Sequence, residues 1–221
     1  MTKIHVASVS LIHAEKVGEA AVRPYLSLYR LTARSTYTDG TASAPYPYDA
    51  VLRKWLDAVA IILIAQIDSE PAILLRAAVR PPMLIRHLAY TPIPAETAPV
   101  CVWELPAGLI EPGDEGESGI VRRAVYETLE ETGFRIDAGQ VRLLPGAPYV
   151  TPGVLPERIW FALVHVEDAE VREHPVGDGS PLEDHAECRW VALGRAIEMC
   201  DAGEIDDMKT ELGIRRAVAL L

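Results

Sequence analysis

The feature that most constrains the fold is the apolar run from Ala58 to Ile67, AVAIILIAQI. A half-exposed strand would alternate apolar and polar side chains, so this composition is typical of a strand that is buried on both faces. A second strand-like run, from Ala72 to Arg80, follows after the short segment DSEP. We therefore expect these two runs to lie at the centre of a sheet.

Further strands and helices follow without a regular βαβ alternation, which predicts a mixed sheet with helices packed on it, an α/β fold. Residues 117–132 have apolar side chains at helical spacing, and Gly133 stands where a left-handed C-cap would end the helix. The other segments typical of strands are 101–105, 157–167 and 187–193, and 195–221 is typical of two helices broken around Gly203. The segment PAGLIEPG, residues 106–113, is predicted to form a turn before the first helix because of its glycines and prolines.

The N-terminal residues 1–56 are predicted to form a separate β-rich segment, and residues 57–221 the main domain. The stretch RPYLSLYRLTARSTYT is rich in Tyr, Leu and Thr and alternates in part. Small residues and proline between Thr38 and Asp49 predict a loop. A second long loop is expected after Arg80-Pro81-Pro82, where four more prolines precede Val100.

Charge and composition narrow the classes of partner. The formal net charge is −11, with 32 acidic and 21 basic residues, which disfavours binding to nucleic acid or to an anionic membrane. The longest apolar run, Ala58 to Ala65, is too short to span a bilayer, and no signal peptide is visible. Three widely spaced cysteines fit reduced thiols. We expect a cytoplasmic protein.

Three carboxylates, Glu127, Glu130 and Glu131, are expected on one face of the last helical turn, because they are spaced i, i+3 and i+4. They repel one another, and each acid at a helix C-terminus is disfavoured by about 0.3–1 kcal/mol when it is exposed. One interpretation is an ordinary acidic surface in which Arg122 and Arg123 pair with acids one turn later. The other is a Mg²⁺ (or Mn²⁺) site, because a divalent ion turns the repulsion into coordination.

The segment ELPAGLIEPGDEG…YETLEETGF resembles the Nudix box, the loop–helix signature of hydrolases that cleave a nucleoside diphosphate linked to another group. Eleven residues, instead of seven, follow the box acid, Tyr126 replaces the box arginine, and Thr128 replaces an apolar residue. Four extra residues are close to one helical turn, so the helix can begin one turn earlier. The matching residues are Gly108, Asp114, Glu127, Glu130, Glu131, Gly133 and Phe134.

Four segments outside the box resemble the ADP-ribose pyrophosphatase-like branch of this family. The resemblance covers roughly residues 25–221, and the order of the segments around the box supports it. They are Arg80-Pro81-Pro82, the box entry from Trp103 to Gly108, Val150 to Gly153 followed by Glu157-Arg158, and Gly203 to Asp207 with Lys209-Thr210.

This resemblance implies an α/β/α Nudix sandwich and an N-terminal β-subdomain that helps to form a homodimer. By the same resemblance, Glu127, Glu131 and the carbonyl of Ala107 hold Mg²⁺, and Glu130 is a further ligand. The implied substrate contacts are Arg80, Gly108 and Pro152, and the implied general base is Glu157.

The implied activity is hydrolysis of the pyrophosphate bond of a nucleoside diphosphate sugar, for example ADP-ribose to AMP and a sugar phosphate. Tyr126 and the stretched spacing leave a second hypothesis open, a catalytically inactive Nudix-like domain that binds a nucleotide or an interaction partner. A third keeps hydrolysis and changes the substrate to another sugar nucleotide, a dinucleotide or a nucleoside triphosphate. Arg122 or Arg123 is expected to replace the box arginine, and Arg123 stands four residues before Glu127.

Overall fold

The computed structural model describes residues 6–17, 25–84, 101–170, 172–175, 177, 179 and 186–221. It divides into two compact units. The N-terminal unit comprises Met1–Leu56 and Tyr149–Arg158, and the main unit comprises Asp57–Pro148 and Ile159–Leu221. Most of the long loop predicted after Arg80 lies outside the described residues.

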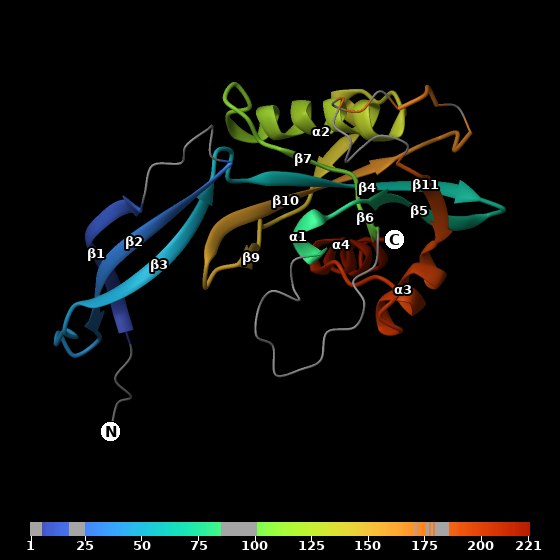
Figure 1. Cartoon of the computed structure of the whole chain (residues 1–221). Coiled ribbons are helices and arrows are strands. Elements are labelled where there is room, and N and C mark those ends of the chain that lie inside the picture. Colours follow the sequence, from blue (N-terminus) through green and yellow to red (C-terminus); the bar gives the residue numbers. More distant parts are fainter. Residues whose placement is uncertain are drawn as a thin grey trace. The chain divides into compact units, whose positions relative to one another are not determined.

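The N-terminal unit contains an antiparallel sheet in the order β1-β2-β3, drawn in blue and cyan in Figure 1. The predicted loop from Thr38 to Asp49 is wrong in its last four residues, because β3 begins at Tyr46. Pro47 is compatible with this strand, since β3 is at the edge of the sheet, where a proline need not donate to a neighbour. The strands are β1 (Val6–Val17), β2 (Leu26–Tyr37) and β3 (Tyr46–Arg53).

The segment Tyr149–Arg158 belongs to the same unit, although it comes late in the chain. It contains β9 (Tyr149–Thr151) and the first residues of β10 (Leu155–His165), which pair antiparallel. The backbone N–H of Val51 donates to the carbonyl of Val154 at 2.9 Å. This hydrogen bond ties the segment to β3.

The main unit is built on a mixed sheet, as the sequence predicted. The strand order is β11-β5-β4-β10-β8, with β6 paired to β5 and β7 to β4. The β4–β10 pair is parallel, whereas β4–β5, β5–β11 and β8–β10 are antiparallel. The remaining bounds are β4 (Ala58–Ile67), β5 (Glu70–Ala78), β6 (Val102–Glu104), β7 (Ala107–Leu109), β8 (Val141–Leu143) and β11 (Cys188–Ala192).

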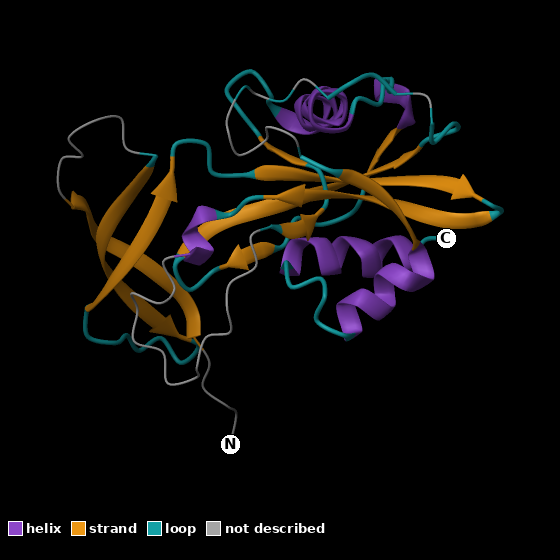
Figure 2. Cartoon of the chain, turned by 45° about the vertical axis from the view of Figure 1, so that its right-hand side comes forward, coloured by secondary structure: helices purple, strands orange, loops and turns teal. Residues whose placement is uncertain are grey.

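Helices cover both faces of this sheet, as Figures 1 and 2 show. Helix α2 (Gly116–Thr132) lies on one face, and α3 (Leu193–Asp201) and α4 (Met208–Val218) lie on the other. Side chains of β4 alternate between them: Ile61 shares a buried cluster with Ala124 of α2, whereas Ile62 lies beside Gly213 of α4. The prediction that β4 is buried on both faces is confirmed.

The predicted helix ends are also observed. Gly133 caps α2 in the left-handed conformation with φ 78°, and its N–H donates to the carbonyl of Leu129. The tail forms two helices on either side of Gly203. A short helix, α1 (Pro81–Leu84), follows β5, and the segment 107–109, predicted as a turn, forms strand β7 because it pairs with β4.

Two predictions from composition can be compared with the described residues. Cys101, Cys188 and Cys200 are free thiols. Within the described part of the chain, we find no helix with the length and apolar character needed to cross a membrane.

Candidate functional site

Helix α2 places two of the three predicted carboxylates inside the protein. The helix begins two residues after Asp114 and runs without a break to Thr132, so the extra residues of the box lie within one helix. Glu127 and Glu131 are 9% and 5% exposed, whereas Glu130 is half-buried. Burial of two acids is inconsistent with an ordinary acidic surface, because charged side chains are buried only when they are paired or bind a ligand.

Strand β7 meets both buried carboxylates. The backbone N–H of Ala107 donates to Oε2 of Glu131 at 2.8 Å. A Cβ atom on Gly108 would meet the carboxylate of Glu127 far inside the 3.0 Å that such atoms keep, so only glycine leaves room for this side chain. The structure thus brings together Ala107, Gly108, Glu127 and Glu131.

Arg123 lies beside a box glutamate, as expected of a residue that replaces the box arginine lost at Tyr126. Its Nη1 atom lies 3.5 Å from Oε1 of Glu127, and its Nη2 atom lies 2.8 Å from Oδ2 of Asp114. Arg122 also contacts Asp114, at 3.0 Å, and no contact between Arg122 and a box glutamate is observed among the described residues. The geometry therefore favours Arg123 over Arg122, while Tyr126 is 55% exposed.

Asp114 holds Arg123 in this position. Burial by itself would raise the pKa of the Asp114 carboxyl, but hydrogen bonds from Arg123, the backbone of Glu111 and Arg122 hold that pKa below its ordinary value. Asp114 therefore stays ionised at neutral pH. It links the loop before α2 to the arginine that contacts Glu127.

Arg76 of β5 is the partner of Glu131 and was missed by the sequence interpretation. Its Nη1 atom lies 3.0 Å from Oε1 of Glu131, and the two side chains are 6% and 5% exposed. The signal was present in the sequence, because Arg76 is the one charge in the strand segment AILLRAA. A charge in a strand that is buried on both faces requires a buried partner.

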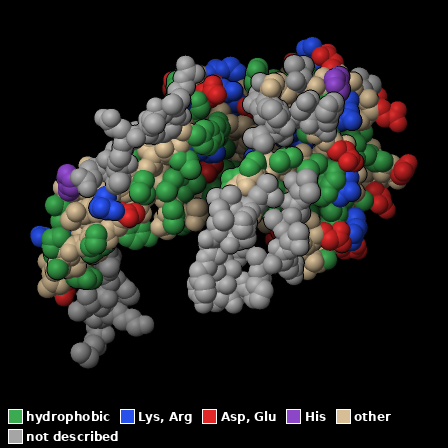
Figure 3. All heavy atoms as spheres, viewed as in Figure 1, with side chains coloured by type: hydrophobic (Ala, Val, Ile, Leu, Met, Phe, Trp, Pro, Cys, Tyr) green, Lys and Arg blue, Asp and Glu red, His purple; other side chains and the backbone are tan. Residues whose placement is uncertain are grey.

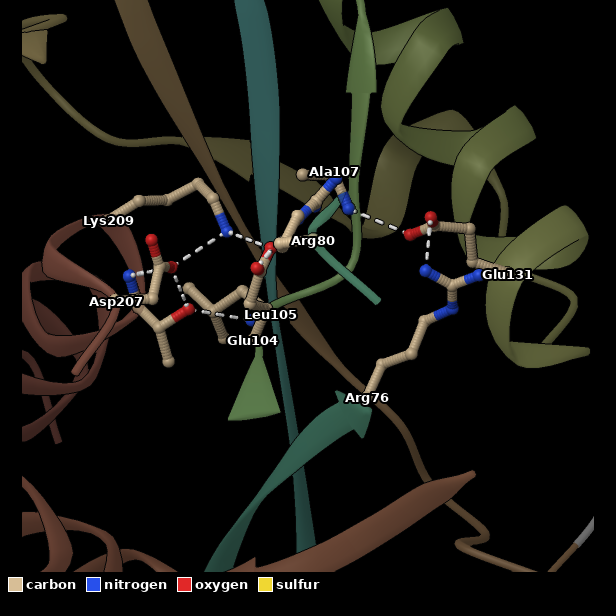
Figure 4. A network of polar contacts seen from close by, with 9 residues as sticks. Arg76, Arg80, Glu104, Leu105, Ala107, Glu131, Asp207 and Lys209 are labelled. Carbon is tan, nitrogen blue, oxygen red and sulfur yellow. Dashed lines mark hydrogen bonds and ion pairs between the residues drawn. The ribbon is translucent and has the colours of Figure 1, made fainter. Parts of the chain in front are cut away.

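A second ion network joins the box entry to helix α4, as Figure 4 shows. Arg80 donates two hydrogen bonds to the Glu104 carboxylate, from Nε at 2.8 Å and from Nη2 at 2.6 Å. Nζ of Lys209 lies 3.1 Å from Oε2 of Glu104 and 2.9 Å from Oδ2 of Asp207. Asp207 caps α4 by accepting from the backbone N–H of Thr210 at 3.0 Å.

This network keeps its acids charged. Burial by itself would raise the pKa of Glu104, but Arg80 and Lys209 outweigh it and hold that pKa below the ordinary value. The same pairing raises the pKa of Arg80, chiefly through its hydrogen bonds to Glu104. Arg80, the predicted substrate contact, is thus a fixed and half-exposed cation.

Two predicted site residues, Pro152 and Glu157, lie in the N-terminal unit. Glu157 is buried and forms an ion pair with Arg53 of β3. Pro152 is exposed in the turn between β9 and β10. Their assigned roles, general base and substrate contact, stay predictions.

The fit of a divalent ion rests on Glu127 and Glu131. The described residues form no group of three or more His, Cys, Asp or Glu side chains that could hold a metal. Mg²⁺, however, is commonly held by one or two carboxylates together with substrate phosphates. Two buried carboxylates one turn apart, against backbone without a Cβ at Gly108, fit that kind of site.

Comparison with known proteins identifies the family. Residues 57–210 match the NUDIX domain. A GDP-mannose pyrophosphatase of Salmonella arizonae is 38% identical over 106 residues, 48% of this chain and 50% of that protein. A GDP-mannose pyrophosphatase of Salmonella typhimurium is 37% identical over the same shares. The chain spans about half the length of these curated relatives.

A solved structure described as an ADP compounds hydrolase has a similar fold. The superposition has a TM-score of 0.64 and covers 98% of this chain and 96% of that one, with 11% sequence identity. This similarity confirms the predicted α/β fold. Because the domain match extends over well more than half of the sequence, the chain belongs to the Nudix family.

Proposed function

We propose that this protein is a divalent-metal-dependent hydrolase that cleaves the pyrophosphate bond of a nucleoside diphosphate sugar. Membership of the Nudix family supports hydrolysis of a nucleoside diphosphate compound. The GDP-mannose pyrophosphatases among its relatives support a sugar nucleotide of the ADP-ribose or GDP-mannose type. The observation that carries the proposal is the burial of Glu127 and Glu131 against Ala107 and Gly108.

In this proposal Glu127, Glu131 and the carbonyl of Ala107 hold Mg²⁺ or Mn²⁺, and Glu130 is a further ligand. A bound divalent ion would neutralise phosphate charge and make a water molecule more acidic. The water attacks one phosphorus atom, and the other phosphate leaves with the sugar or the nucleoside.

The other proposed roles belong to residues outside helix α2. Arg80 binds a phosphate oxygen, because its pairing with Glu104 fixes a guanidinium that can form directional hydrogen bonds. Gly108 and Pro152 are proposed to contact the substrate through the backbone and the turn. Glu157 is proposed to take the proton from the water.

A substrate panel with varied metals tests this function. We expect AMP from ADP-ribose or GMP from GDP-mannose in the presence of Mg²⁺ or Mn²⁺, and no product after a chelator is added. Glu131→Gln should lower turnover by orders of magnitude. The matched control is Glu198→Gln on α3, whose side chain is 70% exposed, and it should keep wild-type turnover. Turnover that is unaffected by chelator and by Glu131→Gln would refute the proposal.

One observation favours a second candidate, a catalytically inactive domain that binds a nucleotide. Glu131 and Glu127 each have an arginine partner within the protein, Arg76 and Arg123. The acids therefore do not require a metal for charge balance. Tight binding of a sugar nucleotide without turnover, equal in wild type and Glu131→Gln, would favour this candidate over the first.

We also propose that the N-terminal unit mediates a homodimer. It exposes several large apolar side chains, and Figure 3 shows apolar side chains, in green, on the visible face of this unit. Leu26 and Leu28 are two residues apart on β2 and therefore lie on the same face of the sheet. Exposed apolar side chains that share a face are typical of protein interfaces. Sedimentation of wild type should give a dimer, and Tyr25→Ser with Leu26→Ser should give a monomer. The exposed residues are Ile12, Tyr25, Leu26, Leu28 and Tyr48.

A further inference from the structure

Arg76 is a buried cation that the proposed chemistry does not use. It lies on β5, and its Nη1 atom is 3.0 Å from Oε1 of Glu131. The two side chains are 6% and 5% exposed, so water contributes little to the screening of either charge. Figure 4 shows the guanidinium of Arg76 turned toward the Glu131 carboxylate, which also accepts a hydrogen bond from the backbone N–H of Ala107.

Both oxygens of Glu131 therefore have a protein donor. Oε1 contacts Arg76, and Oε2 accepts the N–H of Ala107 at 2.8 Å. A divalent ion that binds through Oε1 would have to take the place of the Arg76 contact or share the oxygen with it. Sharing places a cation of charge +2 near one of charge +1 in a poorly screened site, which is unfavourable.

Glu127, the other buried box glutamate, is paired less closely than Glu131. Arg123 lies 3.5 Å from Glu127 but 2.8 Å from Asp114, so its main partner is the aspartate. Arg123 can stay with Asp114 when Glu127 binds another cation. The competition with a metal is therefore concentrated at Glu131 and Arg76.

We propose that Arg76 is a built-in counter-ion that neutralises Glu131 when no divalent ion is bound and that weakens the binding of that ion. The inference rests on the metal-binding part of the proposed function. It makes Arg76 a residue that sets the metal affinity of the site. It also explains how the protein buries Glu131 without a metal, since a buried charge must be paired.

The test measures Mn²⁺ binding by electron paramagnetic resonance, independently of hydrolysis. Removing the competing charge in Arg76→Gln should tighten Mn²⁺ binding by at least about tenfold. Arg76→Lys keeps the positive charge and should bind Mn²⁺ like wild type. Arg135→Gln is the control for net charge, because Arg135 is exposed and pairs with Glu173, and it should also bind like wild type.

A second measurement is made on wild type, and a variant is needed only to assign one resonance. The side-chain Nε–H resonance of Arg76, assigned by its loss in Arg76→Lys, should shift when Mg²⁺ is added. Loss of the Glu131 carboxylate from Nη1 would change the environment of the whole guanidinium, including Nε. A resonance that stays fixed at Mg²⁺ concentrations that saturate the site overturns the proposal.

The remaining outcomes separate this inference from the proposed function. Equal Mn²⁺ affinity in wild type and Arg76→Gln, or weaker affinity in the variant, overturns the inference alone, because Arg76 then supports the fold or positions Glu131. Absence of Mn²⁺ binding in both proteins overturns the inference and the metal site together. Tighter Mn²⁺ binding in Arg76→Gln, together with no hydrolysis of any sugar nucleotide by wild type, supports the inference and refutes the enzymatic proposal.

Discussion

The substitution Gly108→Ala probes the contact between strand β7 and Glu127 directly. The backbone at Gly108 does not have a positive φ, so alanine meets no conformational barrier there. The new methyl group would overlap the Glu127 carboxylate, and this side chain must turn to another rotamer. That movement separates Glu127 from Arg123 and from Gly108. Overpacking of this kind costs about 1–3 kcal/mol of unfolding free energy.

At roughly 2–4 °C per kcal/mol for a domain of this size, the melting temperature should fall by about 2–12 °C. Hydrolysis should fall at least about 100-fold, since a displacement of about 1 Å in a catalytic group has that effect. Calorimetry measures the first change and AMP or GMP release the second. The control is Gly139→Ala in the 3-10 helix Ala138–Gln140, where a Cβ meets no described heavy atom within 4 Å. A Gly108→Ala protein that matches this control in both assays would refute the close contact.

Three further predictions concern the charged groups. Arg123→Met should lower the unfolding free energy by about 1–3 kcal/mol, because buried Asp114 loses one of its hydrogen-bond donors. Tyr126→Phe should leave the denaturant midpoint unchanged. An unchanged midpoint in Arg123→Met would contradict the role assigned to Arg123. Glu131→Gln should destabilise the metal-free protein by about 3–5 kcal/mol, because it removes the charge that pairs with buried Arg76. Chemical denaturation that shows no loss of unfolding free energy would contradict the buried ion pair. Glu104 has a pKa below its ordinary value of 4.5, so its stabilising effect is present at neutral pH and is lost as the pH falls below 4.5. Glu104→Gln should therefore flatten the decline of unfolding free energy between about pH 5 and pH 3. Parallel declines in wild type and variant would count against the ion network around Glu104.

The pattern of the sequence was sufficient for the elements around the site. The apolar composition of β4 predicted burial on both faces, and the helical spacing of apolar residues in α2 with Gly133 at its end predicted the helix that carries the box glutamates. Both follow from local rules, since side-chain burial and capping depend on residues close in the chain. The prediction failed where pairing decides structure, at the edge strand β3 and at β7.

The candidate site was also predicted only in part from the sequence. Sequence placed Glu127 and Glu131 on one helix face and named both arginines as substitutes for Tyr126, but it could not choose between Arg122 and Arg123. That choice depends on the direction in which the loop with Asp114 returns to the helix. The linkage of Glu104 to Lys209 also had no local signal, because it joins a strand to a helix more than a hundred residues away.

The sequence by itself determined a strand that is buried on both faces, a capped acidic helix and a segment that resembles the Nudix box. Only the tertiary structure decided which cation neutralises each buried acid. Periodicity shows whether a residue faces inward, but a partner from a distant strand is set by sheet register and helix packing. Arg76 and Glu131 meet because β5 and α2 are both packed in the main unit. In our proposal this ion pair sets how readily a divalent ion binds.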